Sequence, residues 1–157
     1  MIERQFTVTV YILDGNKTLL LNHPKHQKWL PPGGHVEPGE TPPECGKREV
    51  LEETGLEIEY IKQENIWINA WNARSFERPY LCLLENIPPH GIQGAHQHLD
   101  LIYVAKQVGG SLLKEPVEKN LLRWWTLEEM DQHLSEEELF GETKETIEHL
   151  FIKSSNF

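Results

Sequence analysis

The sequence is poor in cysteine, in positive charge and in long apolar runs. Its two cysteines, Cys45 and Cys82, match no metal or redox spacing, so we expect them to be reduced and partly buried. Lys and Arg number 15 against 25 Asp and Glu, a net charge of −10, which argues against a nucleic-acid or anionic membrane partner. No apolar run approaches the ~20 residues that cross a bilayer.

The length and hydrophobic content of the chain are sufficient for one globular domain. The 157 residues are 38% hydrophobic, which suffices for a sizeable core, so we expect a single domain over residues 1–157. The opening stretch MIERQFTVTVYIL alternates like a strand and does not read as a signal peptide. We therefore expect a cytoplasmic protein, and a homodimer stays open.

Alternating apolar and polar residues predict most of the strands. DGN (Asp14–Asn16) is a hairpin turn, and HPKHQKWLPPGG (His23–Gly34) is too rich in Pro and Gly for regular structure, so we expect a loop there. The predicted strands are Thr7–Leu13, Lys17–Asn22, Leu56–Gln63, Arg78–Ile87, His98–Val108 and Asn120–Leu127.

Two longer helices are predicted between and after these strands. A capping box at Thr41 and a C-cap glycine at Gly55 bound a helix over Pro42–Thr54. TLEE at Thr126 is a second possible cap, and Glu136–Lys153 has the pattern of an amphipathic helix with an apolar face of Ile147, Leu150 and Phe151. Strands flanked by helices predict an α/β sandwich with a mixed sheet.

Three glutamates of the first helix lie on one of its faces. At about 100° per residue, Glu49, Glu52 and Glu53 share an arc beside Arg48, which can pair with Glu52. The alternative is a solvated acidic face, but such a face usually intersperses Lys with Glu. A divalent cation would remove the repulsion, and oxygen ligands without His or Cys favour Mg²⁺ or Mn²⁺. Because Mg²⁺ is commonly shared with substrate phosphates, the face predicts a phosphate site.

The other residues of this helix should pack. Val50, Leu51 and Thr54 lie on the opposite side, which we expect to face the sheet. Cys45 and Gly46 fall on the acidic side, where their small size would let another loop approach closely.

The segment Gly34–Leu56 matches the pattern G-x5-E-x7-R-E-U-x-E-E-x-G-U, where U is aliphatic, at every defined position. It is thus similar to the signature box of the Nudix hydrolase family in its generic, MutT-like form. The matching residues are Gly34, Glu40, Arg48, Glu49, Val50, Glu52, Glu53, Gly55 and Leu56.

This resemblance implies a Nudix fold, an α/β/α sandwich, and Mg²⁺-dependent hydrolysis of a nucleoside diphosphate linked to another moiety. Nucleoside triphosphates, ADP-ribose, nucleotide sugars and dinucleoside polyphosphates all remain open as substrates. It also implies that Glu49, Glu52 and Glu53 bind metal, together with the backbone carbonyl of Gly33. Which glutamate activates the water stays open.

By the same resemblance, Arg48 holds a glutamate in place and Glu40 supports the loop. A further carboxylate outside the box is common in the family, and Asp100 is our first candidate for it, with Glu85 as a weaker alternative. His96, His98 and Asp100 should share one face of a strand, opposite Leu99, Leu101 and Tyr103. A water-exposed edge strand is the alternative interpretation of that face.

Several residues are candidates for substrate binding. Trp29 precedes the Gly-Gly pair, His98 flanks Asp100, and Arg74 and Arg78 are plausible phosphate contacts. Ordinary packing or surface exposure is an open alternative for each. The remaining candidates are Trp67 and Trp71, which could stack a base, and the basic loop of His23, Lys25, His26 and Lys28.

Two functions other than hydrolysis, which belong to different functional classes, are the alternatives. A non-catalytic nucleotide sensor usually has a degraded box and an added DNA-binding domain, whereas this box is intact and the chain has no room for such a domain. Nudix-fold isomerases of isoprenoid diphosphates depart from the box pattern that this chain keeps. The sequence therefore favours the hydrolase.

Overall fold

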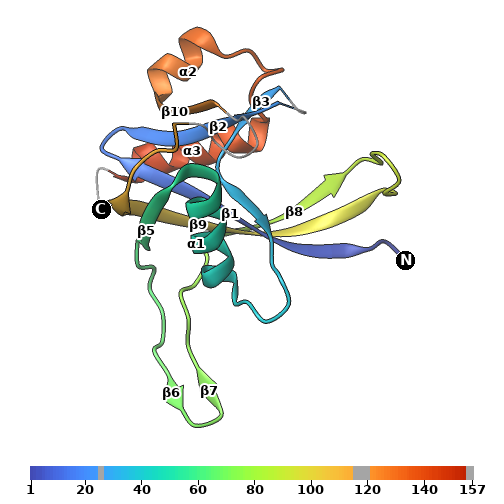
Figure 1. Cartoon of the computed structure of the whole chain (residues 1–157), viewed down its shortest axis with the longest axis vertical. Helices are drawn as coiled ribbons and strands as arrows, with labels where there is room; N and C mark the ends of the chain where they lie inside the picture. The colour runs from blue at the N-terminus through green and yellow to red at the C-terminus, as the bar shows by residue number, and fades with distance from the viewer. Residues whose placement is uncertain (25–26, 115–120, 155–157) are drawn as a thin grey trace.

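Ten strands and three helices form the described part of the chain, residues 1–24, 27–114 and 121–154 of the computed structural model (Figure 1). The helices are α1 (Pro42–Thr54), α2 (Leu127–His133) and α3 (Gly141–Ser154). The strands are β1 (Arg4–Asp14), β2 (Lys17–His23), β3 (Lys28–Leu30), β4 (Gly33–His35), β5 (Leu56–Tyr60), β6 (Asn69–Ala70), β7 (Ala73–Arg74), β8 (Leu81–Ile87), β9 (His96–Gly110) and β10 (Leu121–Thr126).

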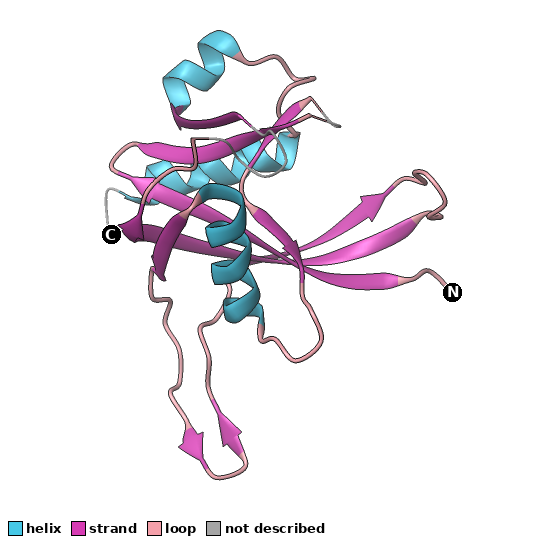
Figure 2. Cartoon of the chain, in the orientation of Figure 1, coloured by secondary structure: helices cyan, strands magenta, loops and turns pink. Residues whose placement is uncertain are grey.

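Eight of these strands form one mixed sheet with β1 and β9 at its centre (Figure 2). Its main path runs β10-β2-β1-β9-β5, while β3, β4 and β8 pair with β2, β1 and β9 respectively. The β1–β9 pair is parallel, from Arg4 opposite Gln97 to Ile12 opposite Ala105, and the other pairs are antiparallel. Strands β6 and β7 pair only with each other.

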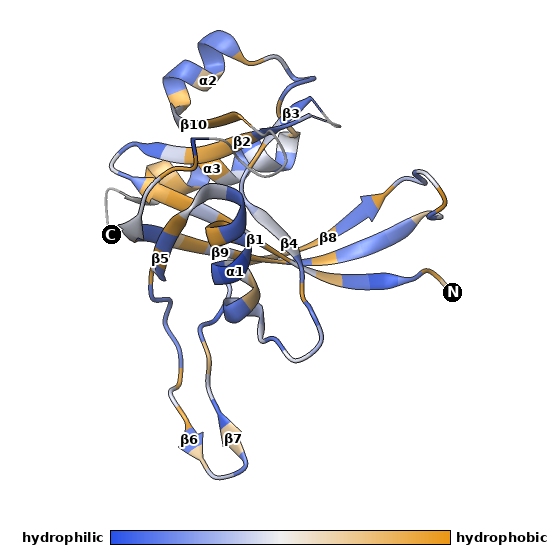
Figure 3. Cartoon of the chain, in the orientation of Figure 1, coloured by the Kyte–Doolittle hydropathy of each residue, from blue (hydrophilic) through white to orange (hydrophobic). Residues whose placement is uncertain are grey.

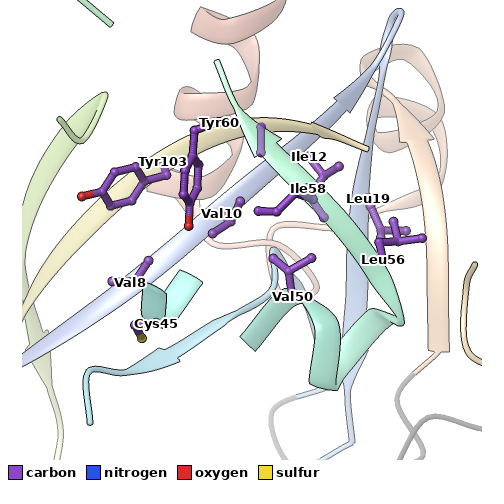
Figure 4. Close-up of a cluster of buried hydrophobic side chains, with 11 residues drawn as sticks. Val8, Val10, Ile12, Leu19, Cys45, Val50, Leu56, Ile58, Tyr60 and Tyr103 are labelled. Carbon is purple, nitrogen blue, oxygen red and sulfur yellow. The ribbon is translucent and has the colours of Figure 1, made fainter. Parts of the chain in front are cut away.

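Alternation along β1 divides its side chains between two cores. Val8, Val10 and Ile12 pack with Val50 of α1 and Tyr103 of β9 on one face of the sheet (Figure 4). Successive side chains of a strand point to opposite faces, so one strand serves both layers. Helix α1 is held on the sheet by this cluster.

The second core lies on the other face of the sheet. Tyr11 of β1 and Ile102 of β9 pack there with Ile147 and Leu150 of α3, which are fully buried. Helices α1 and α3 thus cover opposite faces, and the predicted α/β sandwich with a mixed sheet is confirmed (Figure 1).

Most predicted elements are present with shifted ends, and one prediction is wrong. Helix α1 has the predicted bounds, and the caps at Thr41 and Thr126 are both capping boxes. The segment expected as a loop instead contains β3 and β4, because pairing with β2 and β1 satisfies its backbone groups despite the prolines. Helix α3 begins at Gly141, five residues later than predicted, and Asn120 lies outside the described residues.

Two parts of the molecule extend beyond this sandwich (Figure 1). The β6–β7 hairpin projects as an arm, and the ends of β1, β8 and β9 project on another side. The ends of these three strands are largely hydrophilic, whereas the central strands are largely hydrophobic (Figure 3). In the part of the chain described, no helix has the length and apolar character to cross a membrane.

Candidate functional site

Helix α1 is fixed at both ends by local sequence. At its start the backbone N–H of Thr41 donates to the Glu44 carboxylate over 2.8 Å, which closes the capping box. At its end Gly55 adopts a left-handed conformation with φ of 79°, and its N–H donates to the Leu51 carbonyl. This conformation is unstrained only for glycine, so the helix ends where the sequence requires it.

Arg48 is the centre of the charged cluster on α1. Its Nε and one terminal nitrogen contact the two carboxylate oxygens of Glu40 at 2.6 and 3.0 Å, a bidentate pair. Its other terminal nitrogen contacts Glu49 at 2.7 Å and Glu52 at 3.3 Å, while the terminal nitrogen that contacts Glu40 also donates to the His35 carbonyl. The predicted Arg48–Glu52 pair is confirmed, but the shorter contacts are with Glu40 and Glu49.

These contacts change the ionisation of the cluster. The hydrogen bonds from Arg48 lower the pKa of Glu40 to about 2. Burial raises the pKa of Glu49 even though Arg48 opposes the shift, and only 15% of its side chain is exposed against 58% for Glu52. The cluster therefore contains one carboxylate firmly held as an anion, one buried carboxylate and one that is open to solvent.

Strand β4 presses its backbone against the same carboxylates. The N–H of Gly33 donates to the Glu53 carboxylate over 3.3 Å. A Cβ atom at Gly34 would collide with the carboxylate of Glu49 as it is placed here, so a larger residue would displace that carboxylate. The Cys45 thiol lies 3.4 Å from the His35 carbonyl, so a neighbouring segment does approach at Cys45 as predicted.

Two expectations for α1 need correction. Gly46 faces the sheet, where a Cβ would collide with the Tyr60 hydroxyl, and no loop from the acidic side reaches it in this arrangement. Leu51 was expected to pack on the sheet but is exposed, because α1 lies on the sheet through Val50 and Thr54. Cys82 is likewise exposed rather than partly buried.

The ligand atoms at this site are of the type that a hard divalent cation prefers. Glu49, Glu52 and Glu53 offer only oxygen, and the Gly33–Gly34 backbone lies beside two of them. No group of three or more His, Cys, Asp or Glu side chains is arranged ready to hold a metal ion anywhere in the described residues. Arg48 instead bridges Glu49 and Glu52, so a cation already lies between carboxylates at this point.

Asp100 lies on the other face of the sheet. It is 3% exposed, and its carboxylate oxygens accept hydrogen bonds from the hydroxyls of Thr7 and Thr9 at 2.9 and 2.8 Å. Ile102, two residues further along β9 and on the same face, packs in the core that contains α3. Leu101, on the opposite face, packs in the core that contains α1. Asp100 therefore shares a face with α3 and not with α1.

The predicted split of β9 side chains between two faces is confirmed. The rings of His96 and His98 contact each other on the Asp100 side, and Tyr103 packs on the α1 side. The alternative of an exposed edge is wrong, because β9 is paired on both sides and His96 is buried. Burial with no cationic partner raises the pKa of Asp100.

Glu85 and His98 adjoin each other on this face, 3.7 Å apart. Burial raises the pKa of Glu85 to about 7, with the charges of Asp100 and Glu142 adding to the effect. Burial also lowers the pKa of His98 to about 4, helped by three neighbouring histidines, His35, His96 and His90.

The other predicted substrate residues are dispersed. Trp29, on β3, packs edge-to-face on Trp125 with ring centroids 5.0 Å apart, so it contributes to the α3-side core. Arg74 lies on the arm strand β7, and Arg78 follows the arm; both are exposed. Arg74 lies near enough to Glu44, in the first turn of α1, for its charge to help lower the pKa of that carboxylate.

The arm also carries the two tryptophans proposed to stack a base. Trp71 is 99% exposed and Trp67 is more than half exposed, so internal packing does not explain either. In the basic loop, Lys25 and His26 lie outside the described residues, while Lys28 lies over the ring of Phe140. A separate pocket beside the start of α1 is lined by Gln5, Phe6, His35, Val36, Pro42 and Leu101.

The NUDIX domain family model matches residues 3–150, which is nearly the whole chain. The chain belongs to the NUDIX family. Among solved structures, a NUDIX-family hydrolase from Clostridium perfringens is 27% identical, with a TM-score of 0.73 over 95% of this chain and 99% of that one.

More distant Nudix structures share the fold alone. A UDP-X diphosphatase is 18% identical with a TM-score of 0.63, and covers 99% of this chain and 66% of its own. The MutT protein of Bacillus halodurans is 21% identical with a TM-score of 0.59, over 94% of this chain and 82% of its own.

A curated relative matches locally. The m7GpppN-mRNA hydrolase NUDT17 of Xenopus laevis is 47% identical over 45 residues, which is 27% of this chain and 15% of that protein. The Nudix chain described here thus spans a small part of the length of this curated relative.

Sequence reasoning missed two features of the Asp100 face of the sheet. The first is the pair of threonines that hold Asp100, although Thr7 and Thr9 alternate correctly with Val8 on a predicted strand. The second is the gathering of His35 and His90 beside His96 and His98, for which the only local signal was the His-x-His spacing.

Proposed function

We propose that this Nudix protein hydrolyses a diphosphate linkage in a nucleoside diphosphate linked to another moiety, with Mg²⁺ or Mn²⁺ as cofactor. The observation that carries the proposal is that Glu49 and Glu52 lie against Arg48, while Glu49 and Glu53 lie beside the Gly33–Gly34 backbone. Such a cluster of oxygen donors is what a hard cation shared with phosphates requires.

The protein's part in this reaction is to fix ligands. Arg48 anchors Glu49 and is itself anchored by the bidentate contact with Glu40, so the helix presents its carboxylates in one orientation. When bound, the divalent ion would neutralise and polarise the diphosphate. Water adds to one phosphorus atom, the bridging P–O bond breaks, and two phosphate-containing products leave.

We propose a small-molecule substrate and, in keeping with the net charge of −10, no nucleic-acid or membrane partner in the cytoplasm. The four substrate classes named above remain candidates. UDP-linked diphosphates and the m7GpppN cap belong in the test panel because neighbours are named for them. We propose Trp29, Arg74, Arg78 and His98 as substrate contacts, and Asp100 as the auxiliary carboxylate.

A phosphate-release screen over this panel tests the proposal. Released products are treated with a phosphatase that cannot attack the intact substrates, and phosphate is then measured with Mg²⁺ present. We expect one class to be cleaved by the wild type and not by Glu53→Gln. Glu59→Gln, an exposed glutamate on β5, is the matched control and should retain activity. Equal release by the wild type and Glu53→Gln, or none over the whole panel, would refute the proposal.

Removal of the cation gives an independent test. Chelation should abolish turnover, and Mg²⁺ or Mn²⁺ should restore it, because the α1 carboxylates alone carry no positive charge to offset the diphosphate. Activity that survives the chelator would contradict the mechanism.

A further inference from the structure

Strand β9 begins with His96 in the region where β1, β8 and β9 project beyond the helices (Figure 3), and the rings of His90 and His98 lie beside that of His96. His96 and His98 are two residues apart on β9, so their side chains point to the same face. Their Nε2 atoms are 3.3 Å apart, and His96 is only 4% exposed. The proposed hydrolysis uses His98 as a substrate contact but has no role for His96 or for the contact between the two rings.

Hydrogen bonding orients the ring of His96. Its Nδ1 lies 3.0 Å from the carbonyl oxygen of Gly94, which can only accept a hydrogen bond. The Nδ1 atom therefore carries the hydrogen, and the Nε2 atom presents its lone pair to His98.

Glu85 favours the same arrangement in the ring of His98. Its carboxylate oxygen lies 3.7 Å from His98 Nδ1, on the side of the ring away from His96, and it sits directly opposite His98 in the strand register. A carboxylate or carbonyl beside Nδ1 is the usual partner that orients a metal-binding histidine. The contact between the two Nε2 atoms has two possible forms: one ring keeps a hydrogen on Nε2 and donates it to the other, or both rings carry their hydrogen on Nδ1 and both lone pairs face a bound cation.

The separation of the two nitrogens matches a shared metal ion. Two ligands of a tetrahedral Zn²⁺ at about 2.0–2.1 Å are about 3.3–3.4 Å apart. We propose that His96 and His98 bind a divalent transition-metal ion of the Zn²⁺ class through their Nε2 atoms. Imidazole ligands suit Zn²⁺, Ni²⁺ and Cu²⁺, whereas Mg²⁺ prefers oxygen.

This site has two protein ligands in the structure and open positions beyond them. No third His, Cys, Asp or Glu in the described residues completes it as it stands. His35 is held away, because its Nε2 contacts the Gln5 side-chain oxygen at 2.8 Å. His90 is the neighbour suited to join, since it is exposed in the β8–β9 connection with its ring 5.9 Å from that of His96. Water fills the remaining positions.

The site is chemically separate from the α1 carboxylates. Its ligands are imidazole nitrogens on the α3 side of the sheet, whereas α1 provides carboxylate oxygens on the other side. Excess Mg²⁺ should therefore occupy the carboxylates without displacing Zn²⁺ from the histidines.

Isothermal titration of the full-length, tag-free protein with Zn²⁺ in excess Mg²⁺ tests the proposal. We expect one site in the wild type, and at least about tenfold weaker binding in both His96→Asn and His98→Asn, since each loses a direct ligand. His133→Asn, an exposed histidine on α2, is the matched control and should bind like the wild type. Glu53→Gln should also bind Zn²⁺ normally, which separates this site from the proposed hydrolytic one.

Ring-nitrogen NMR distinguishes a shared metal from a shared proton. Zn²⁺ should shift the Nε2 resonances of both histidines and leave their Nδ1 resonances protonated. The proposal is overturned if the two Nε2 resonances are unchanged by Zn²⁺, as for a plain hydrogen bond between the rings. It is also overturned if His96→Asn and His98→Asn, shown folded by circular dichroism, bind Zn²⁺ like the wild type, or if Glu53→Gln abolishes the binding.

Discussion

Both faces of the sheet gather carboxylates, but Glu40 and Glu49 on the α1 side contact the Arg48 guanidinium, whereas Asp100 on the α3 side is held by hydroxyl groups. Contact with Arg48 lowers the pKa of Glu40 to about 2. On the α3 face, Asp100 is held by threonine hydroxyls and the pKa of Glu85 is raised to about 7 by burial. Glu40 is thus kept ionised beside Arg48, whereas Glu85 is pushed toward its neutral form.

This difference shows that the surroundings of a carboxylate decide its chemistry. A positive charge already sits between Glu49 and Glu52, so this position is electrostatically suited to cations. The buried Asp100 is satisfied by two hydroxyl donors instead, which suits hydrogen bonding. A residue that carries a carboxylate, as the glutamates of the Nudix box do, is therefore not placed in their site by that group alone.

Paired substitutions on the two faces should give the largest effect. Glu53→Gln is expected to lower kcat by at least about 100-fold, because it removes charge where the diphosphate is polarised. Asp100→Asn is expected to lower it by at most about tenfold, because Asp100 lies on the other face and can act only through Thr9, which is opposite Gly33 of β4. Steady-state kinetics on the substrate found in the screen provides the measurement. Near-normal turnover in Asp100→Asn would move the auxiliary role elsewhere, with Glu85 as the next candidate.

Removal of the Arg48 guanidinium should destabilise the protein on the α1 side of the sheet. Arg48→Ala leaves Glu40 and Glu49 largely buried without their partner, so the free energy of unfolding should fall by about 2 kcal/mol, between the values for exposed and buried pairs. Urea denaturation measures the change. Lys47→Ala, an exposed neighbour on the same helix, is the control. Equal stability of the two variants would show that the cluster is not held by Arg48.

Opposite pH dependence should distinguish Glu40 from Glu85. The pKa of Glu40 is lowered on folding, so its stabilisation is present above about pH 4.5 and is lost as the pH falls toward 2. Glu40→Gln should therefore be less stable than the wild type by about 1–2 kcal/mol at neutral pH, with the gap closing in acid.

The pKa of Glu85, which faces Asp100, Glu142 and His98, is raised on folding, so its contribution is fully present below about pH 4.5 and is lost as the pH rises through 7. Glu85→Gln should accordingly be more stable than the wild type by about 1–2 kcal/mol above pH 7, and equal to it below pH 4.5. Unfolding curves over this pH range, without added metal, provide the test. Parallel pH profiles for the two variants would contradict the comparison of the faces.

Sequence patterns predicted the parts of the fold that depend on residues close together in the chain. Helix α1 was predicted with its observed ends because Thr41 and Gly55 act within one turn of it. Strands β3 and β4 were missed because their hydrogen-bond partners lie on β2 and β1, and the prolines between them suggested a loop. Leu51 was misplaced because helical spacing gives the faces of a helix but not the angle at which it meets a sheet.

The sequence by itself determined the helix, its caps and the spacing of Glu49, Glu52 and Glu53, because each depends on residues a few positions apart. Only the tertiary structure decided that Arg48 is held mainly by Glu40, that Asp100 meets threonines 91 and 93 residues away, and that its face is opposite α1. It also brought His35 beside His98. Such contacts depend on the pairing of strands, and no pattern along the chain records which distant strand will be the neighbour.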